Sequence, residues 1–576
     1  MSLRLLLVLL LAPCPAAAAT PHDSGREGVS ETLLRAMRDE MKRTVSQLRL
    51  EGLEKPYFVS QTVRERSQVD LEGTFGALRR PRVFRARSLK VELRVGAPEF
   101  DDTHYVGNDV RGFRPMVASL PLEDDYDALR FEIWSLTDRA YKQALERFAH
   151  KTAYKQARNI VEEIRDLSED PVQSFRETAM AAGFDRALWE NRLRKVSEVF
   201  RRFPAIQTSG ARLWWSAEHL YFVDSQGRSF VKPTHLYEIR LSAKAQAEDG
   251  MTQSDERRIV GNAADELPSL ESLVAEAEQL AADVTALARA PQAATYLGPV
   301  LLEAQAAGEF FNQLLASGVS NPRSLWIEQQ WAEQYFESGS LAGRLGLRVV
   351  SPMIDVFDDP TLREWDGQRM IGHYGVDDEG IPGRRVQLVQ RGILKDLLMS
   401  RTPTRERKLS NGHGRSDFKE HLTSRIGNLV ISASETMSAK ALRRRLREEA
   451  RAFGLQHGLL VRRIAPEDGQ DNDELLAHPV LVYSVDVDTG DEHLLRDAQF
   501  TAVTLRALRD IIAASEQQRV HNFRKLGSVR GSRSYVPATI VHPAVLLTEM
   551  ELKPTDRKPD KRPYLKHPFF DRASPP

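Results

Sequence analysis

The chain has 576 residues, of which 41% are hydrophobic, and this is enough to bury the cores of two or three domains. Lysine and arginine together number 81, and aspartate and glutamate also number 81, so the formal net charge is zero. Without a basic field the composition gives no support to a nucleic-acid-binding protein. A polypeptide or a small molecule is the more natural partner.

The first 19 residues have the pattern of a cleavable signal peptide. Arg4 supplies a positive charge, Leu5–Leu11 form an unbroken apolar run, and Ala16–Ala19 are small residues suited to cleavage. The apolar run is shorter than the roughly 20 residues that a membrane-spanning helix needs. We therefore expect an exported protein, periplasmic or extracellular, with no membrane span. Cys14 is the single cysteine, so the mature chain would have no disulfide and no thiolate ligand.

Residues 20–250 are expected to form an N-terminal domain of mixed α/β structure. Ser30 can cap a helix whose apolar residues recur at helical spacing. A long, charged, helix-favouring region from Tyr126 to about Asp166 is interpreted as a helical insertion or hairpin, and the insertion is placed at about 124–200. Strand-like alternation is found in four stretches, at residues 57–63, 88–95, 211–223 and 230–245.

Residues 251–345 are expected to form a central segment with a helix capped by Ser269 and a short strand at 298–302. The remainder is expected to be mainly β, with a Ser438-capped helix between its strands. The fold class predicted for the whole chain is α+β. The other expected parts are a β-rich domain at 346–540, a last helix at 502–515, and a Pro- and Lys-rich surface tail at 541–576.

Six short segments rich in glycine, acidic residues and turns occur in the C-terminal half: LAGRLGLRVV (341–350), IDVFDDPTL (354–362), GVDDEGIP (375–382), VQRGILKDL (389–397), LSNGHGRS (409–416) and LLRDAQF (494–500). In this order they resemble the TldD/PmbA family of metallopeptidases. The resemblance implies an N-terminal α/β domain and a C-terminal β domain that pairs with a second subunit around a cavity. Active members bind zinc there and hydrolyse peptides and unstructured polypeptides.

The catalytic signature of that family is His-Glu-x-x-x-His on a helix. The two histidines and a cysteine hold zinc, and the glutamate takes a proton from the metal-bound water. The corresponding segment here begins at Leu302 and ends at Ala307, so that Glu303 alone remains. No His-x-x-x-His pair occurs elsewhere in the sequence, which therefore predicts no zinc ligands and no zinc cofactor.

Glu303 has two interpretations. Without a metal it is a helix-start carboxylate or a salt-bridge partner. The alternative is that Glu303 and Glu309 face one cavity as an acid and base pair, which would make Glu303 catalytic.

Two further groups of residues are candidate binding sites. Gly412 and Gly414 flank His413, and two glycines let the backbone approach a ligand while the imidazole donates to a peptide carbonyl. A glycine turn explains the same residues. The acidic run 377–379, with His373 and His413, resembles a hard-cation site, and a structural loop is the other interpretation.

Three functions remain open. The first is a non-catalytic envelope protein of TldD/PmbA type that binds peptide and forms a homodimer or a heterodimer with a related subunit. The second is an active metallopeptidase with replacement ligands such as His373 or His413. The third is a structural envelope protein that binds no peptide. Whether the protein is an enzyme is therefore undecided by the sequence.

Overall fold

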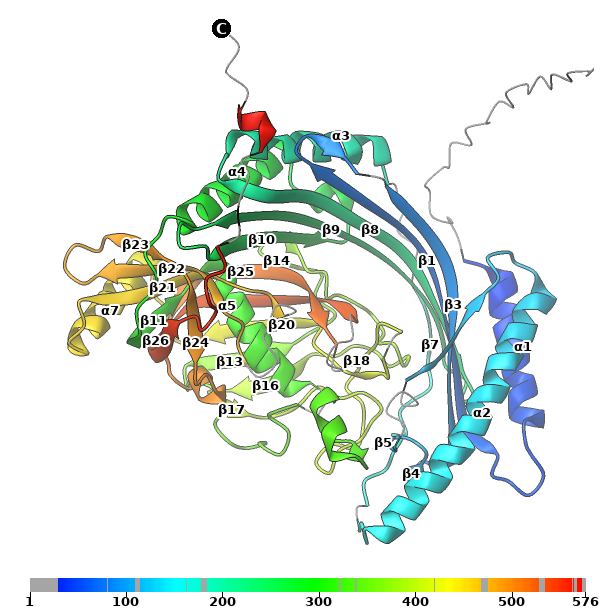
Figure 1. Ribbon diagram of the computed structural model, residues 1–576. Helices are drawn as coiled ribbons and strands as arrows, with labels where there is room; N and C mark the ends of the chain where they lie inside the picture. The colour runs from blue at the N-terminus through cyan, green and yellow to red at the C-terminus, as the bar shows by residue number, and fades with distance from the viewer. Residues whose placement is uncertain are drawn as a thin grey trace, which may run out of the picture.

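The computed structural model describes residues 29–571, apart from 80, 109–113, 162, 178–183, 321–322, 337–338, 419, 468–474, 528–533, 562 and 564–566. The expected signal peptide, residues 1–19, lies outside the described residues. No helix in the described part of the chain is both long enough and apolar enough to cross a membrane. The fold is of the α+β class, as the sequence predicted, with an N-terminal and a C-terminal domain (Figure 1).

The N-terminal domain is built on one long, curved, mainly antiparallel sheet (Figure 1). All four predicted strands are present, and each extends beyond the predicted ends. The sheet also continues past residue 250, where the expected domain ended, because a further strand pairs with its edge along ten positions. The strands are β10 (Thr252–Gly261), β9 (Ser229–Gln246), β8 (Ile206–Asp224), β1 (Pro56–Thr74), β3 (Arg82–Ala97) and β4 (Phe100–Asp101), in spatial order.

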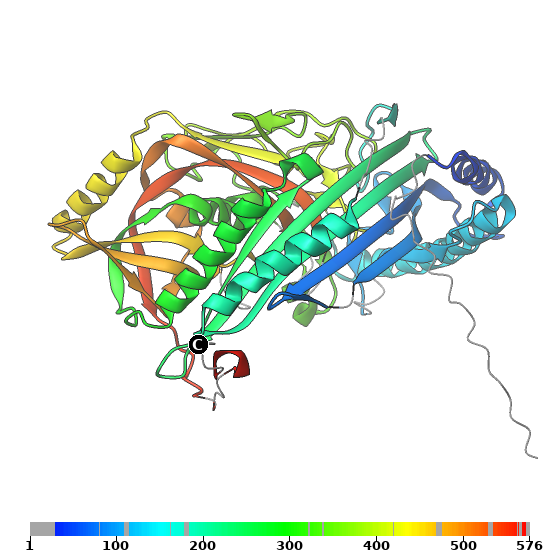
Figure 2. The same ribbon diagram turned by 90° about the horizontal axis from the view of Figure 1, so that it is seen from above.

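Helices cover the convex face of this sheet (Figure 2). Ser30 caps α1 (Glu31–Gln47) by accepting a hydrogen bond from the amide of Leu33, and Ser269 caps α4 (Leu270–Leu287) in the same way. Such a cap contributes about 1 kcal/mol. Both helices confirm the predicted caps, because capping and apolar spacing are local signals.

The region at 124–200 is not a hairpin of helices. It contains α2 (Tyr126–Ala157), a short strand β7 (Ser174–Arg176) and α3 (Arg186–Glu198). Buried residues of α2 pack with α1 against the sheet, whereas α3 packs with α4 in a separate core. The long helix is thus a part of the domain's framework.

The C-terminal domain is a mixed sheet whose order is β17-β16-β13-β20-β26-β11-β21-β22-β23. Its largest core lies against α5 (Ala304–Phe310) and the π-helix η4 (Phe311–Ala316). Helix α7 (Ala439–Ala452) packs on β11 and β21. The strands are β17 (Ile393–Leu394), β16 (Val386–Gln390), β13 (Ile354–Asp358), β20 (Asn428–Ala433), β26 (Tyr535–Pro554), β11 (Tyr296–Leu302), β21 (His457–Ile464), β22 (Pro479–Asp486) and β23 (Glu492–Leu495).

Two predictions near the C-terminus were wrong. Residues 502–515 form a short 3-10 turn and then the start of β25 (Ile511–Leu526), in place of a helix. Residues 541–554, expected in a surface tail, belong to β26, which pairs with β20, β11 and β25. Val541 and Val545 are fully buried there. Long-range strand pairing, which has no local sequence signal, overrides the local propensities in both stretches.

The curved sheet wraps around one side of the C-terminal domain (Figures 1 and 2). Ion pairs join the two domains along this boundary. Arg463 contacts Asp255 at 3.1 Å, Lys232 contacts Asp378 at 2.6 Å, and Arg524 contacts Glu238 at 2.7 Å. The concave face of the N-terminal sheet is therefore occupied by the chain's own second domain.

Candidate functional site

The helix at which the family places its zinc site is α5, which follows β11 directly. Leu302 ends the strand, Ala307 lies one turn into the helix, and both are fully buried in the core. Ala304 adopts a left-handed backbone with φ of 49°, which is strained for a residue other than glycine. The zinc that the resemblance implies does not fit these residues, because neither ligand position carries a donor atom.

Glu303 is held by arginines from other elements. Its two carboxylate oxygens accept hydrogen bonds from Nε and Nη2 of Arg443 on α7, at 3.1 and 3.0 Å. Arg462 on β21 adds a contact at 3.9 Å. This fork geometry holds the carboxylate in a salt bridge. It leaves Glu303 poorly placed to take a proton from water.

Glu309 lies in different surroundings and shares no contact with Glu303. It is 4% exposed and accepts hydrogen bonds from the amides of Asn312 and Gln313, at 3.0 and 2.9 Å. Its other oxygen lies 3.3 Å from Nε2 of His521 on β25. The structure therefore does not bring Glu303 and Glu309 together as an acid and base pair.

His413 is buried and fully engaged by protein groups. Its Nε2 lies 3.0 Å from Oδ1 of Asp358, and its Nδ1 lies 3.0 Å from Oδ1 of Asn411. Gly412 has φ of 78°, and a side chain there would overlap the carbonyl oxygen of Pro382. A side chain at Gly414 would overlap the carboxylate of Glu379. Packing of the chain against itself thus accounts for the two glycines and the histidine.

The carboxylates of the acidic turn at 377–379 are also bound by other groups of the chain. Asp377 accepts three backbone amides, each at 2.9 Å, and Asp378 pairs with Lys232. Burial raises the pKa of Asp377 to about 6 and, with the charge of Asp377, raises the pKa of Glu379 to about 8. His373 contacts the carbonyl of Pro360 at 3.0 Å and does not join this group. The structural-loop interpretation accounts for all of these contacts.

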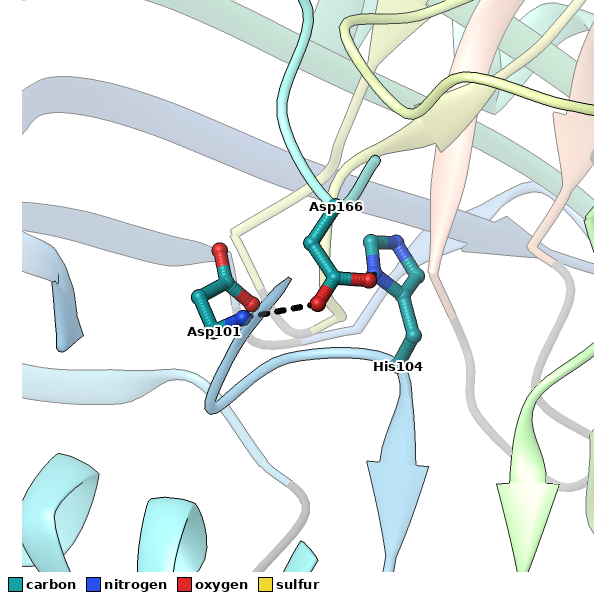
Figure 3. A group of neighbouring side chains, drawn as sticks. All are labelled: Asp101, His104 and Asp166. Atoms are coloured by element: carbon teal, nitrogen blue, oxygen red, sulfur yellow. Dashed lines mark hydrogen bonds and ion pairs between the residues drawn. The ribbon is translucent and has the colours of Figure 1, made fainter. Parts of the chain in front are cut away.

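A group that the sequence did not single out consists of Asp101, His104 and Asp166 (Figure 3). One potential ligand atom from each lies within 4.8 Å of the others. However, Asp166 contacts Lys151 at 2.6 Å and Arg323 at 2.8 Å. Burial and the charge of Arg323 lower the pKa of His104 to about 4, so the ring is neutral. Both carboxylate oxygens of Asp166 are thus already paired with cationic side chains.

The sequence reasoning also missed His521 and His542, which lie beside α5. Each is isolated in the sequence, and each falls near or within a stretch whose secondary structure was predicted wrongly. Recognition of β25 and β26 as a paired hairpin would have placed both histidines on one face of the sheet.

Comparison with known proteins shows which part of the chain is similar in sequence to a known family. Residues 295–553 match the model of the PmbA/TldA metallopeptidase C-terminal domain. A metalloprotease of Methanocaldococcus jannaschii is 29% identical over 137 residues, which is 24% of this chain and 27% of that protein. A TldD homologue described as a metalloprotease, from Haemophilus influenzae, is 29% identical over 17% of this chain and 20% of its own length. The matched segments thus span about a quarter or less of these relatives.

The likeness in fold extends further than the likeness in sequence. TldE from Thermococcus kodakarensis superimposes with a TM-score of 0.55 at 12% identity, over 90% of this chain and 99% of that one. The family signature thus lies in the C-terminal half, whereas the shared architecture includes both domains. The chain belongs to the TldD/PmbA family of metallopeptidase-like proteins.

Proposed function

We propose that this protein is a non-catalytic member of its family, which binds peptide or unstructured polypeptide without hydrolysing it at the family site. The observation that carries the proposal is the set of side chains at the start of α5, where the family places its zinc ligands. Both histidine positions are occupied by buried apolar residues, Leu302 and Ala307, and Glu303 is bound by Arg443. Hydrolysis by this family's mechanism needs a metal-bound water and a free carboxylate beside it, and neither requirement is met.

We further propose that the protein acts as one subunit of a pair, formed with itself or with a TldD/PmbA-like relative. The likeness to TldE supports a partnership of this kind. The concave face of the N-terminal sheet is filled by the chain's own C-terminal domain, so a cavity that encloses a polypeptide would need a second subunit. The first 19 residues support a location outside the cytoplasm, in the periplasm or beyond.

The direct test is incubation of the purified protein with an unstructured polypeptide, with and without a chelator. No cleavage is expected, whereas a fluorescent version of the same polypeptide should bind in an anisotropy titration. The matched variant is Glu303→Gln. Cleavage by the wild type that is lost in Glu303→Gln would show that the family mechanism survives, and would refute the proposal.

The location and the partner need separate measurements. Cell fractionation with N-terminal sequencing tests export, and an N-terminus near residue 20 is expected. Size-exclusion chromatography with light scattering tests self-association. A protein that is monomeric and that captures no family relative would leave the subunit part of the proposal without support, while the cleavage result would stand.

A further inference from the structure

Three side chains from separate elements meet on the inner side of α5. Glu309 belongs to the helix, His521 to β25 and His542 to β26. In the antiparallel register His521 faces Ile540 and His542 faces Arg519, so the two histidines are diagonal neighbours on one face of the hairpin. Their ring centroids lie 6.5 Å apart, and Nε2 of His521 lies 3.3 Å from Oε1 of Glu309.

Gly308 lets both imidazoles approach the helix backbone closely. A methyl group at this position would lie 2.9 Å from Nε2 of His542 and 3.1 Å from Cδ2 of His521. Both imidazoles therefore border the same small volume, next to the helix backbone. Any larger residue at position 308 would intrude on it.

The donor atoms are in the chemical state that a metal ion requires. Nδ1 of His542 lies 3.1 Å from the carbonyl oxygen of Pro543, which can only accept, so this nitrogen carries the proton. Nε2 therefore offers a lone pair. Glu309 accepts hydrogen bonds from the side-chain amides of Asn312 and Gln313, which favour the ionised carboxylate.

The partners of this buried carboxylate are two side-chain amides and one imidazole. Among the residues that the structure describes, no lysine or arginine forms a salt bridge with Glu309, and its partner is the ring of His521. Asn312 donates from Nδ2 to Glu309, while its Oδ1 has no hydrogen-bond partner although the residue is 2% exposed. Buried charges and buried polar atoms are normally compensated. The unpartnered Oδ1 of Asn312 thus lies on a residue bonded to a carboxylate that no lysine or arginine of the described residues neutralises.

The backbone at this place is also unusual. The helix changes from α to π geometry at Phe311, directly after the segment that carries Glu309, and the π-helical turns include Asn312. Short π-helical stretches inside helices occur frequently at functional sites, because they redirect side chains by a fraction of a turn. Here Asn312, within the π-helical stretch, donates a hydrogen bond to Glu309.

We propose that Glu309, His521 and His542 bind a divalent transition metal ion such as Zn²⁺, with Oδ1 of Asn312 as an additional oxygen donor. Two imidazoles and a carboxylate are a common ligand set for zinc, and nickel or cobalt accept the same set. The ligands differ from those of the family's signature. The inference is independent of the proposed function, because Glu303 stays bound to Arg443 and the site has no free carboxylate beside it to activate water.

The test uses the full-length protein, stripped of metal and titrated with Zn²⁺ by calorimetry and with Co²⁺ by visible absorption. One equivalent should bind, and the Co²⁺ spectrum should show nitrogen and oxygen ligation in a site of low coordination number. Glu309→Gln and His542→Gln should each weaken binding by at least about tenfold. His521→Gln, at a side chain that is 19% exposed, gives a further variant if a buried substitution prevents folding.

Two matched controls separate this site from its alternatives. His104→Gln alters the Asp101–His104–Asp166 group, and Glu303→Gln alters the family glutamate; both should leave metal binding unchanged. The proposal is overturned if the folded wild type binds no metal, if His104→Gln removes the bound ion, or if the Glu309 and His542 variants keep full affinity. Since cleavage of polypeptide is measured separately, a failure here leaves the proposed function untouched.

Discussion

Two groups of histidine and acidic residues in this protein look alike in composition and differ in their surroundings. Around Asp166, Lys151 and Arg323 supply positive charge at 2.6 and 2.8 Å, and His104 completes a closed network. Around Glu309 the partners are amides and the ring of His521, and the neighbouring Oδ1 of Asn312 is left without a donor.

The difference shows how a structural cluster can be told from a ligand site. The residues near Asp166 come within 4.8 Å of one another and so satisfy a purely geometric criterion for a metal site. Their charge is nevertheless balanced by the protein, and the network ties α2 to the loops of both domains. The group near Glu309 is geometrically looser, and no lysine or arginine in the described part of the chain balances its charge. Compensation of charge is thus more informative here than proximity.

The largest loss of stability is expected when a cation that pairs with Asp166 is removed. Lys151→Met leaves the carboxylates of that group buried with one cation fewer, and breaking a buried pair in this way costs about 3–5 kcal/mol. Lys142→Met on the same helix removes an exposed pair with Asp138 and should cost less than about 1 kcal/mol. Urea unfolding of both variants gives the comparison. Equal losses would contradict the structural role given to the Asp166 group.

The second prediction concerns the turn that carries His413. Both ring nitrogens of this histidine are already engaged by protein groups. Gly412→Ala imposes a left-handed backbone on alanine and a clash with Pro382, at a cost of about 1–3 kcal/mol. Gly343→Ala is the control, because that glycine also has positive φ but faces open space. Thermal melts should show a clearly larger drop for Gly412→Ala. A loss of peptide affinity with unchanged stability would instead restore the turn as a binding site.

The third prediction uses pH. The folded state lowers the pKa of His104 to about 4 and of His421 to about 3, against an unfolded value near 6.5. At these two histidines the unfolded chain therefore binds more protons than the folded one below pH 6.5, and their contribution to stability is lost as the pH falls from 6.5 toward 4. The loss between pH 6.5 and pH 4 is about 2–3 kcal/mol per histidine, because one pKa unit corresponds to about 1.4 kcal/mol. The urea midpoint measured against pH should fall less steeply in His104→Gln. A slope identical to that of the wild type would exclude His104 as a contributor.

The smallest effect is expected at Glu303. Its partner Arg443 is 43% exposed, and a salt bridge with one solvent-exposed member contributes less than about 1 kcal/mol. Glu303→Gln should therefore change the melting temperature little and leave any bound metal in place. A strong loss of stability would mean that Glu303 has a structural role beyond this pair.

The sequence determined the elements whose signals are local. Ser30, Ser269 and Ser438 each cap a helix as predicted, because a cap and the apolar spacing after it lie within a few residues. The order of short motifs in the C-terminal half gave the family, which the match to residues 295–553 supports. The absence of donor atoms at positions 302 and 307 could likewise be read directly, since it depends on residue identity alone.

Only the tertiary structure decided which of the remaining polar residues act together. The pairing of β25 with β26 joins residues that a local prediction assigned to a helix and to a surface tail, and it brings His521 and His542 to one face beside Glu309. The partners of Glu303 and Asp166 also come from distant segments. Whether a charge is compensated depends on neighbours brought together by packing, so no spacing along this chain could have distinguished the balanced group from the unbalanced one.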